Sequence, residues 1–204
     1  MMVLYWSSRS PFVRKVMVVA HETGQAERIR TERVVVSNRT TNAEVMRDNP
    51  LGKIPTLRLP DGTVLYDSAT ICEYLDSQVD GPKLYPPAGP ARWTALRRHA
   101  LGTGLLDNLV LWRGAREWPH RITDLEAALD AKTRAALDAL EAEAPALARD
   151  PFTIGQITIG VALAYLDFRF GWLEWRTGRP ALAAWHAEFS DRPSVRATAF
   201  VDVT

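Results

Sequence analysis

The pattern of apolar and polar residues changes once along the chain. In the first 80 residues, short apolar runs alternate with segments whose apolar residues recur every three to four positions, typical of alternating strands and helices. Residues 3–6 predict a first strand, and residues 32–36, with the sequence ERVVV, predict a second. Between them, helical spacing runs from Pro11 to a stop at Gly24.

The remainder of this first segment completes one sheet. A polar turn at 37–42 precedes a short possible helix, and residues 56–59 and 64–66 flank a PDG turn that predicts a hairpin. Apolar residues from Ser68 onward predict a closing helix. The order β-α-β-α-β-β-α favours a parallel crossover followed by a hairpin, and therefore one mixed sheet with helices on its faces.

Beyond this segment the apolar pattern is almost entirely helical. Residues 80–90, DGPKLYPPAGP, have the proline and glycine content of a linker. A capping box, TIGQ at 153–156, predicts the start of one later helix. We expect helices at roughly 91–118, 123–144, 154–170, 179–190 and 194–200. The sequence thus predicts a sheet domain at 1–80, a linker at 81–90 and an all-helical domain at 91–204.

Composition removes several classes of function. The chain has 25 Lys+Arg against 24 Asp+Glu, so it lacks the basic excess that a nucleic-acid or anionic-membrane partner normally requires. The longest apolar-rich stretch, 157–175, is interrupted by charged residues and predicts a buried helix rather than a membrane span. The N-terminus lacks the pattern of a signal peptide.

The cysteine and histidine residues argue against disulfides and metal sites. Cys72 is the one cysteine, so no intramolecular disulfide or thiolate metal cluster can form. Its position among apolar residues predicts a buried structural thiol, and a reducing cytoplasmic setting is expected. The four histidines lie far apart without metal-binding spacing, so we expect no metal site.

Two helix starts in the first domain carry candidate chemistry. Ser10-Pro11 predicts an N-cap followed by the first helical residue, and a helix start directly after a strand favours negative charge. Asp67-Ser68 offers amides and a hydroxyl to a carboxylate, and an acid to an ammonium group. Simple helix capping explains either one alone.

A third signal is the proline that opens the strand after NPLGK. A trans Pro55 would be an ordinary edge residue, whereas a cis bond would leave the backbone N–H and C=O of Ile54 free for an extended peptide. Taken with the two helix starts, this segment favours a binding site for a short peptide with charged ends.

Four stretches resemble the cytosolic glutathione transferases in order and spacing: SPFVRKV, NPLGKIPTL, LYDSATICEYL and FTIGQITIGVALAYLDFR. The resemblance spans essentially the whole chain. It implies a thioredoxin-like N-terminal domain with a four-stranded mixed sheet, an all-helical C-terminal domain and a homodimer. It also implies glutathione as co-substrate, with Pro55 as a cis-proline, Ile54 pairing with the cysteinyl part, Asp67 and Ser68 receiving the γ-glutamyl end, and Lys53 reaching the glycine carboxylate.

The resemblance offers two candidate catalytic serines. Ser10 stands where plant tau-type enzymes carry theirs, and Ser7 where zeta-type enzymes do. We favour Ser10, because a hydroxyl at the N-cap itself can donate to a thiolate that the helix dipole also stabilises. Lowering a thiol pKa by roughly two units requires about 2.7 kcal/mol. Omega-type relatives carry cysteine in place of Ser10, so thiol–disulfide exchange by the protein's own nucleophile is disfavoured.

The expected function is therefore a glutathione transferase that activates the glutathione thiol for attack on a small hydrophobic electrophile, in detoxification. Candidate acceptor contacts include Phe12 and Trp112. Two alternatives remain: another glutathione-dependent enzyme, namely an isomerase, an ether-cleaving lyase or a dehalogenase, and a non-catalytic member that binds glutathione or a protein.

Overall fold

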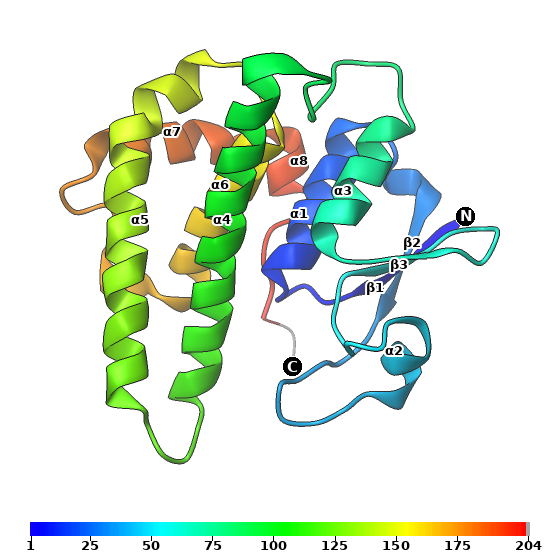
Figure 1. The fold of residues 1–204 in the computed structure, drawn as a ribbon, viewed down its shortest axis with the longest axis horizontal. Helices are drawn as coiled ribbons and strands as arrows, with labels where there is room; N and C mark the ends of the chain where they lie inside the picture. Colours follow the sequence, from blue (N-terminus) through cyan, green and yellow to red (C-terminus); the bar gives the residue numbers. More distant parts are fainter. Residues whose placement is uncertain (203–204) are drawn as a thin grey trace. The chain divides into compact units, whose positions relative to one another are not determined.

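The structure is a computed structural model that describes residues 1–202 and divides into two compact units (Figure 1). Unit 1 comprises Met1–Tyr85 together with the segment from Pro193 onward, and unit 2 comprises Pro86–Arg192. The boundary at Tyr85 falls inside the expected linker. The other boundary differs from the expected division, in which the helical domain continued to residue 204.

The reason for that difference is packing at the end of the chain. Helix α8 (Pro193–Arg196) packs against α1 (Pro11–Glu22) of unit 1. The Arg14 guanidinium donates to the Val195 carbonyl at 3.2 Å, and the Ser194 hydroxyl donates to Glu22 at 2.5 Å. A helix predicted from local spacing alone therefore has its partners almost the whole chain length away.

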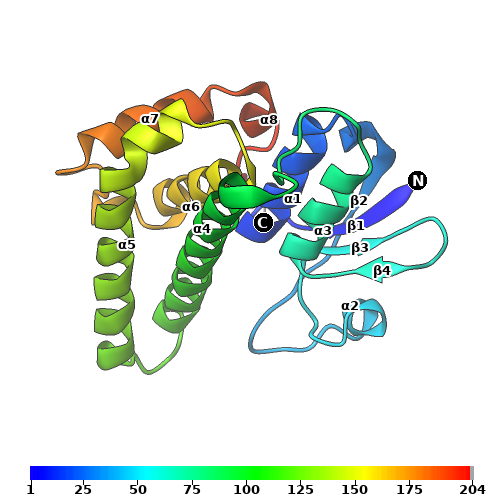
Figure 2. The ribbon, with the colours of Figure 1, turned by 45° about the horizontal axis from the view of Figure 1, so that its top comes forward.

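Unit 1 is built on a four-stranded mixed sheet, as the sequence predicts. Its strands are β1 (Met2–Trp6), β2 (Ile29–Arg33), β3 (Thr56–Arg58) and β4 (Val64–Leu65), in the order β2-β1-β3-β4. Strands β1 and β2 are parallel, and β3 is antiparallel to both of its neighbours. Figure 2 shows β4 at the outer edge beside β3. This is the predicted crossover followed by a hairpin.

Helices cover both faces of the sheet because successive strand residues point to opposite sides. Leu4 is fully buried, whereas the next residue, Tyr5, packs with Val34 and Val45 on the other face. Val45 belongs to α2 (Ala43–Asp48). Helices α1 and α3 (Ser68–Ser77) pack against each other. A short 3₁₀ turn, η1, spans Ala26–Arg28.

The second strand lies three residues earlier than predicted. We expected a strand at 32–36, but β2 ends at Arg33, opposite Trp6, the last residue of β1. Val34 still donates its N–H to the Trp6 carbonyl at 3.1 Å, while Val35 is 67% exposed. The length of the partner strand, rather than the β-branched run, therefore sets where β2 ends.

Unit 2 is helical, which confirms the predicted fold class. It contains α4 (Gly89–Arg116), α5 (Thr123–Arg149), α6 (Ile154–Arg169), η2 (Gly171–Leu173) and α7 (Pro180–Ser190). Helices α4 and α6 approach closely: a Cβ on Gly155 would lie 2.6 Å from the Cβ of Arg98. No helix in residues 1–202 is long and apolar enough to cross a membrane.

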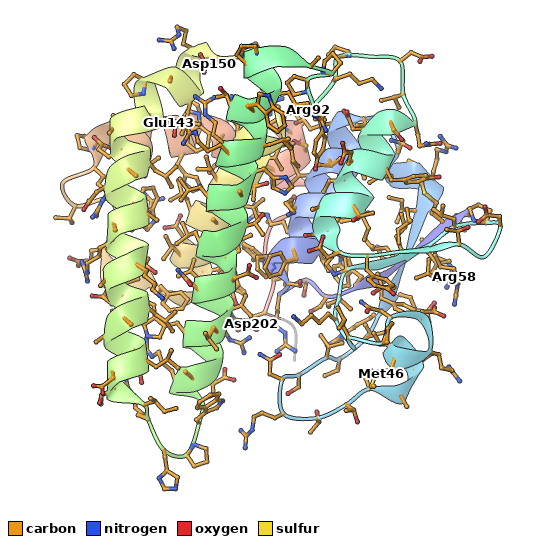
Figure 3. The ribbon with its side chains drawn as sticks, in the orientation of Figure 1. Met46, Arg58, Arg92, Glu143, Asp150 and Asp202 are labelled. Carbon is orange, nitrogen blue, oxygen red and sulfur yellow. The ribbon has the colours of Figure 1, made fainter. Side chains whose placement is uncertain are left out.

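Helix α5 runs past its predicted end. We expected it to stop at 144, before Pro145, but it continues to Arg149. A buried arginine makes two ion pairs at this end of the helix: Arg98, 3% exposed, donates to Glu143 at 2.8 Å and to Asp150 at 2.9 Å. Figure 3 labels both carboxylates at this end of α5. These contacts offset the hydrogen bond that Pro145 cannot donate.

Candidate functional site

Three turn segments of unit 1 lie at the same edge of its sheet. Tyr5 is opposite Thr56, and Leu57 is opposite Leu65. Because β3 is antiparallel to both neighbours, the end of β1, the start of β3 and the end of β4 meet at this edge. Strands lie about 4.8 Å apart, so the three segments span about 10 Å. An extended tripeptide has about the same length.

The first segment is the serine loop, residues 7–10, which connects β1 to α1. Ser10 is the N-cap of α1, and its hydroxyl accepts from the Val13 N–H at 3.3 Å. Pro11 follows at the first helical position. The cap predicted from the sequence is thus confirmed. Within residues 1–202, no acceptor is found for the proton of the Ser10 hydroxyl.

The other serines of the loop have different partners. Ser7 accepts from Ser10 through its carbonyl at 3.1 Å and from the Arg9 N–H through its hydroxyl at 3.4 Å. The Ser8 hydroxyl donates to the Val201 carbonyl at 2.7 Å, near the end of the described chain. Ser7 and Ser10 are therefore the two hydroxyls of the loop whose protons are not committed to a described acceptor.

The second segment contains the Ile54–Pro55 peptide bond, which is cis. This agrees with what the resemblance implies for Pro55. Within the described residues, the backbone N–H and C=O of Ile54 make no hydrogen bond, whereas the Ile54 side chain packs beside Tyr5, Val34 and Val45. The arrangement leaves one free donor and one free acceptor at the start of β3.

A buried asparagine holds this turn in shape. Asn49 is 1% exposed, and its amide donates to the Lys53 carbonyl at 3.1 Å and to the Thr56 hydroxyl at 3.0 Å. Its amide oxygen accepts from the Leu51 N–H at 3.0 Å. Neither Asn49 nor Thr56 belongs to the site residues that the sequence predicts. The available signal was an asparagine before Pro50 in a polar turn, a residue that commonly bonds nearby backbone.

The third segment is the start of α3. Asp67 is its N-cap and accepts from the Ala69 N–H at 2.9 Å. Asp67 is exposed, whereas Ser68 is 2% exposed. The Tyr66–Asp67 peptide bond is also cis. The exposed carboxylate of Asp67 favours a cationic group, whereas the free amides of the first helical turn favour an anionic group. The start of α3 therefore suits a ligand end that carries both charges.

Other predicted site residues lie close by in the chain. Lys53 is exposed and contributes its carbonyl to the Asn49 network. Phe12, in the first turn of α1, is partly buried, and the ammonium group of the fully buried Lys15 lies 5.9 Å from its ring centroid. All the predicted site residues except Trp112 therefore belong to unit 1.

Trp112 belongs to unit 2, in α4. It is 3% exposed and packs against Phe170 at 5.3 Å and Trp172 at 5.4 Å between ring centroids. Trp172 is 53% exposed, and the Arg116 guanidinium lies 4.7 Å from its ring centroid. A role for Trp112 in acceptor binding stays a prediction.

Cys72 is not poised for chemistry. It is fully buried in α3, and burial raises the pKa of its thiol to about 12, while the nearby Lys15 lowers it to a smaller extent. A thiol held protonated is a poor nucleophile. The predicted structural role for Cys72 is confirmed. Among residues 1–202, no group of three or more His, Cys, Asp or Glu side chains is arranged to hold a metal ion.

Comparison with known proteins identifies relatives of both units. The family model for the glutathione S-transferase N-terminal domain matches residues 9–78, and that for the C-terminal domain matches residues 123–188. Glutathione S-transferase GstB of Escherichia coli K12 is 30% identical over 220 residues, which covers 100% of both chains.

Solved structures extend the likeness to three dimensions. A glutathione transferase family member from Pseudomonas fluorescens Pf-5, crystallised with bound glutathione, is 45% identical with a TM-score of 0.94 over 98% of each chain. A structure from the same organism with bound S-(propanoic acid)-glutathione is 44% identical, with a TM-score of 0.89 over 97% of this chain and 98% of that one.

Proposed function

Because this chain belongs to the glutathione S-transferase family, we propose that it binds glutathione at the sheet edge of unit 1 and activates its thiol for attack on a small hydrophobic electrophile. The observation that carries the proposal is the meeting of three segments at one edge: a serine-capped helix start, a free backbone pair before a cis-proline, and an acid-capped helix start. The bound glutathione of the Pseudomonas relative supports it.

In this proposal the tripeptide lies across the edge in extended form. The free N–H and C=O of Ile54 pair with the backbone of the cysteinyl residue, as one strand adds to another. Asp67 binds the γ-glutamyl ammonium group, and the first amides of α3, including that of Ser68, bind its carboxylate. Lys53, exposed on the turn before Pro55, binds the glycine carboxylate.

Ser10 is the proposed activating residue. Its hydroxyl already accepts from an amide, and its own proton is available for donation to the glutathione sulfur. The thiol proton leaves to solvent, and the anion is stabilised by this donor together with the positive end of α1. The thiolate sulfur then forms a bond to an electrophilic carbon. With a chloronitroarene the C–Cl bond breaks and chloride leaves to solvent, whereas with an enone the C=C electron pair moves toward the carbonyl and the adduct takes a proton from solvent. Ser7, the other uncommitted hydroxyl, is the reserve candidate, and the choice corresponds to the tau-like rather than the zeta-like pattern.

The acceptor is proposed to be small and apolar, with Phe12 of unit 1 as a candidate contact. The adduct in the second Pseudomonas structure carries a propanoic acid group, which supports the small size of the acceptor, whereas its carboxyl group is polar and does not bear on the apolar character. A panel of a chloronitroarene, an enone and a cis-dienone tests the reaction class. Conjugation of the first two is expected, whereas turnover of the dienone alone would indicate an isomerase.

We further propose a cytoplasmic homodimer with a role in detoxification. Several large apolar side chains are exposed, among them Val35 and Leu51 at 67% and Trp93 at 70%, and a subunit contact would bury such side chains. Sedimentation is expected to give twice the 22.8 kDa of one chain. A monomer at micromolar concentration would contradict this part of the proposal.

The decisive experiment titrates the thiol of bound glutathione by the ultraviolet absorbance of the thiolate. It compares the wild type with Ser10→Ala and Ser7→Ala. We expect the wild type to lower the thiol pKa by roughly two units, and Ser10→Ala to return it toward its solution value. A solution-like pKa in the wild type would refute activation. A loss confined to Ser7→Ala would assign the role to Ser7.

A further inference from the structure

We propose that the end of the described chain, residues 197–202, positions the serine loop for thiol activation. This segment, called here the tail, follows α8 in unit 1 and runs beside the start of α1 (Figure 1). Ser8 and Phe200 are the positioning residues through which it acts. The inference rests on the proposed function, because it concerns the same activating hydroxyl.

The first contact is a two-way pairing between the loop and the tail. The Ser8 hydroxyl donates to the Val201 carbonyl at 2.7 Å, and the Val201 N–H donates to the Ser8 carbonyl at 3.4 Å. Both the backbone and the side chain of Ser8 are therefore tied to one residue of the tail. Ser8 lies between Ser7 and Ser10, so this pair fixes the middle of the loop.

The second contact anchors the tail on α1. The Arg14 guanidinium lies 4.4 Å from the centroid of the Phe200 ring and donates to the Val195 carbonyl of α8 at 3.2 Å. Arg14 is 9% exposed, so the cation and the ring meet largely out of water, where such an interaction is strongest. Arg14 follows Ser10 by one helical turn, which places the anchor beside the serine loop.

A third contact is weaker. Arg9 and Asp202, the latter labelled in Figure 3, approach to 3.9 Å, and their side chains are 38% and 55% exposed. An exposed ion pair at this separation contributes little. The positioning effect is therefore assigned to the Ser8–Val201 pair and to the Arg14–Phe200 contact.

The backbone of Ser10 is held by hydrogen bonds to Ser7 and Arg14, but among the described residues its hydroxyl is held by the cap bond alone, so the position of the hydroxyl depends on the loop that carries it. The Val13 N–H lies 3.3 Å from the Ser10 hydroxyl, at the long end of the range for a hydrogen bond. Thiol activation depends on where that hydroxyl points, and a shift of about 1 Å in a catalytic group can reduce the rate about a hundredfold. A tail that fixes the loop backbone therefore affects the chemistry more than substrate binding, because Ile54 and Asp67 lie on other segments.

The test uses the full chain in four variants. Ser8→Ala removes the hydroxyl of the loop–tail pair, Phe200→Ala removes the anchor, and Phe200→Tyr keeps an aromatic ring in its place. Ser77→Ala is the matched control, because the Ser77 hydroxyl also donates to a backbone carbonyl at 2.7 Å on an exposed surface, at the far end of α3. For each variant, the pKa of bound glutathione is titrated, and kcat and KM are measured with a chloronitroarene.

We expect Phe200→Ala to raise the pKa of the bound thiol by roughly one unit, with about a tenfold loss of kcat below that pKa. Ser8→Ala shifts the pKa in the same direction by less. Phe200→Tyr and Ser77→Ala keep the wild-type pKa. KM for glutathione stays within about twofold in all four variants, because the segments that bind the peptide are unchanged.

The outcomes separate the two proposals. If the wild type leaves the thiol pKa at its solution value, the proposed function fails. If the wild type lowers it and both Ser8→Ala and Phe200→Ala match the wild type, the tail has no positioning role. The tail also has no positioning role if these two variants raise KM for glutathione while the pKa of the bound thiol stays at the wild-type value. Should Phe200→Ala fail to fold, Ser8→Ala, on the protein surface, decides the question alone.

Discussion

Two helices within residues 1–202, α1 and α6, begin at a hydroxyl cap, and the two caps differ in whether the hydroxyl proton has an acceptor. Thr153 of α6 accepts from the Gly155 N–H at 3.3 Å and donates its own proton to Gln156 at 2.5 Å. Ser10 of α1 accepts from Val13 at the same distance, 3.3 Å, but has no acceptor for its proton within the described residues. The Thr153 hydroxyl therefore both accepts and donates a hydrogen bond, whereas the Ser10 hydroxyl, within that part of the chain, only accepts one.

The difference lies in the residue three positions after the cap. In α6 that residue is Gln156, which completes the capping box and also donates to the Pro151 carbonyl at 2.8 Å. In α1 it is Val13, which is 1% exposed and contributes to the core. A helix start therefore suits an anionic ligand when it has a hydroxyl cap but lacks a polar side chain three residues later that would accept the proton of that hydroxyl.

The largest expected effect comes from removing the open hydroxyl. Ser10→Ala is expected to reduce kcat/KM for a chloronitroarene roughly a hundredfold, about 2.7 kcal/mol, because one donor to the thiolate is lost. Thr153→Ala is the matched variant: it destabilises the fold but leaves the pKa of bound glutathione unchanged. Equal kinetic losses in the two variants would show that the comparison has no functional meaning.

The second effect concerns stability and falls on the closed cap. Gln156→Ala is expected to reduce the free energy of unfolding by about 2 kcal/mol, because it leaves the buried Thr153 hydroxyl and backbone N–H without their acceptor. Urea unfolding measures this loss, and the thiol pKa of bound glutathione serves as control. A loss below about 0.5 kcal/mol in the free energy of unfolding would show that the capping box contributes little to stability.

The third effect concerns the thiol of Cys72, which is held protonated, in contrast to the thiol of bound glutathione. Burial raises the pKa of Cys72 to about 12, so above pH 9 an unfolded chain loses this proton while the folded chain keeps it. Stability is therefore unaffected at neutral pH and falls by about 1.4 kcal/mol per pH unit once the pH exceeds the unfolded pKa.

Urea unfolding of the wild type and Cys72→Ala between about pH 8 and about pH 10 isolates this contribution. The alanine variant has a different absolute stability but lacks the thiol slope. Parallel pH profiles for the two proteins would contradict a protonated, buried Cys72. Thiol alkylation under native conditions should be slow for the same reason.

The smallest effect is expected when the serine hydroxyl at position 10 is replaced by a threonine hydroxyl. Ser10→Thr keeps both the cap and the free donor, so we expect stability within about 0.5 kcal/mol of the wild type and a thiol pKa close to the wild-type value. A pKa as high as that of Ser10→Ala would show that the orientation of the serine, rather than the presence of a hydroxyl, determines activation.

Local features of this fold could be predicted from the sequence. Both hydroxyl caps, the helix stop at Gly24 (φ +67°) and the fold class follow from residues a few positions apart. The residues of the candidate site also lie in short motifs, and the resemblance to the glutathione transferases supplies their expected roles. The structure brings the segments that contain these motifs to one sheet edge, and only Trp112 among the predicted site residues lies in the other unit.

Features that depend on distant partners could not be predicted in this way. The run at 34–36 has strand propensity, but β2 ends where its partner β1 ends. Pro145 predicts a helix end, yet the ion pairs from Arg98 to Glu143 and Asp150 flank the following turn. The loop–tail pair joins Ser8 to a residue 193 positions away, and no local pattern carries that information.

The division of unit 1 into two stretches of sequence affects the order in which the protein can be made. A chain grows from its N-terminus, so the strands and the serine loop emerge first and the residues of unit 2 emerge next. Val201 becomes available to Ser8 only after all of these have been synthesised. The growing chain can thus build the sheet edge early, whereas the serine loop acquires its contact with the tail only later.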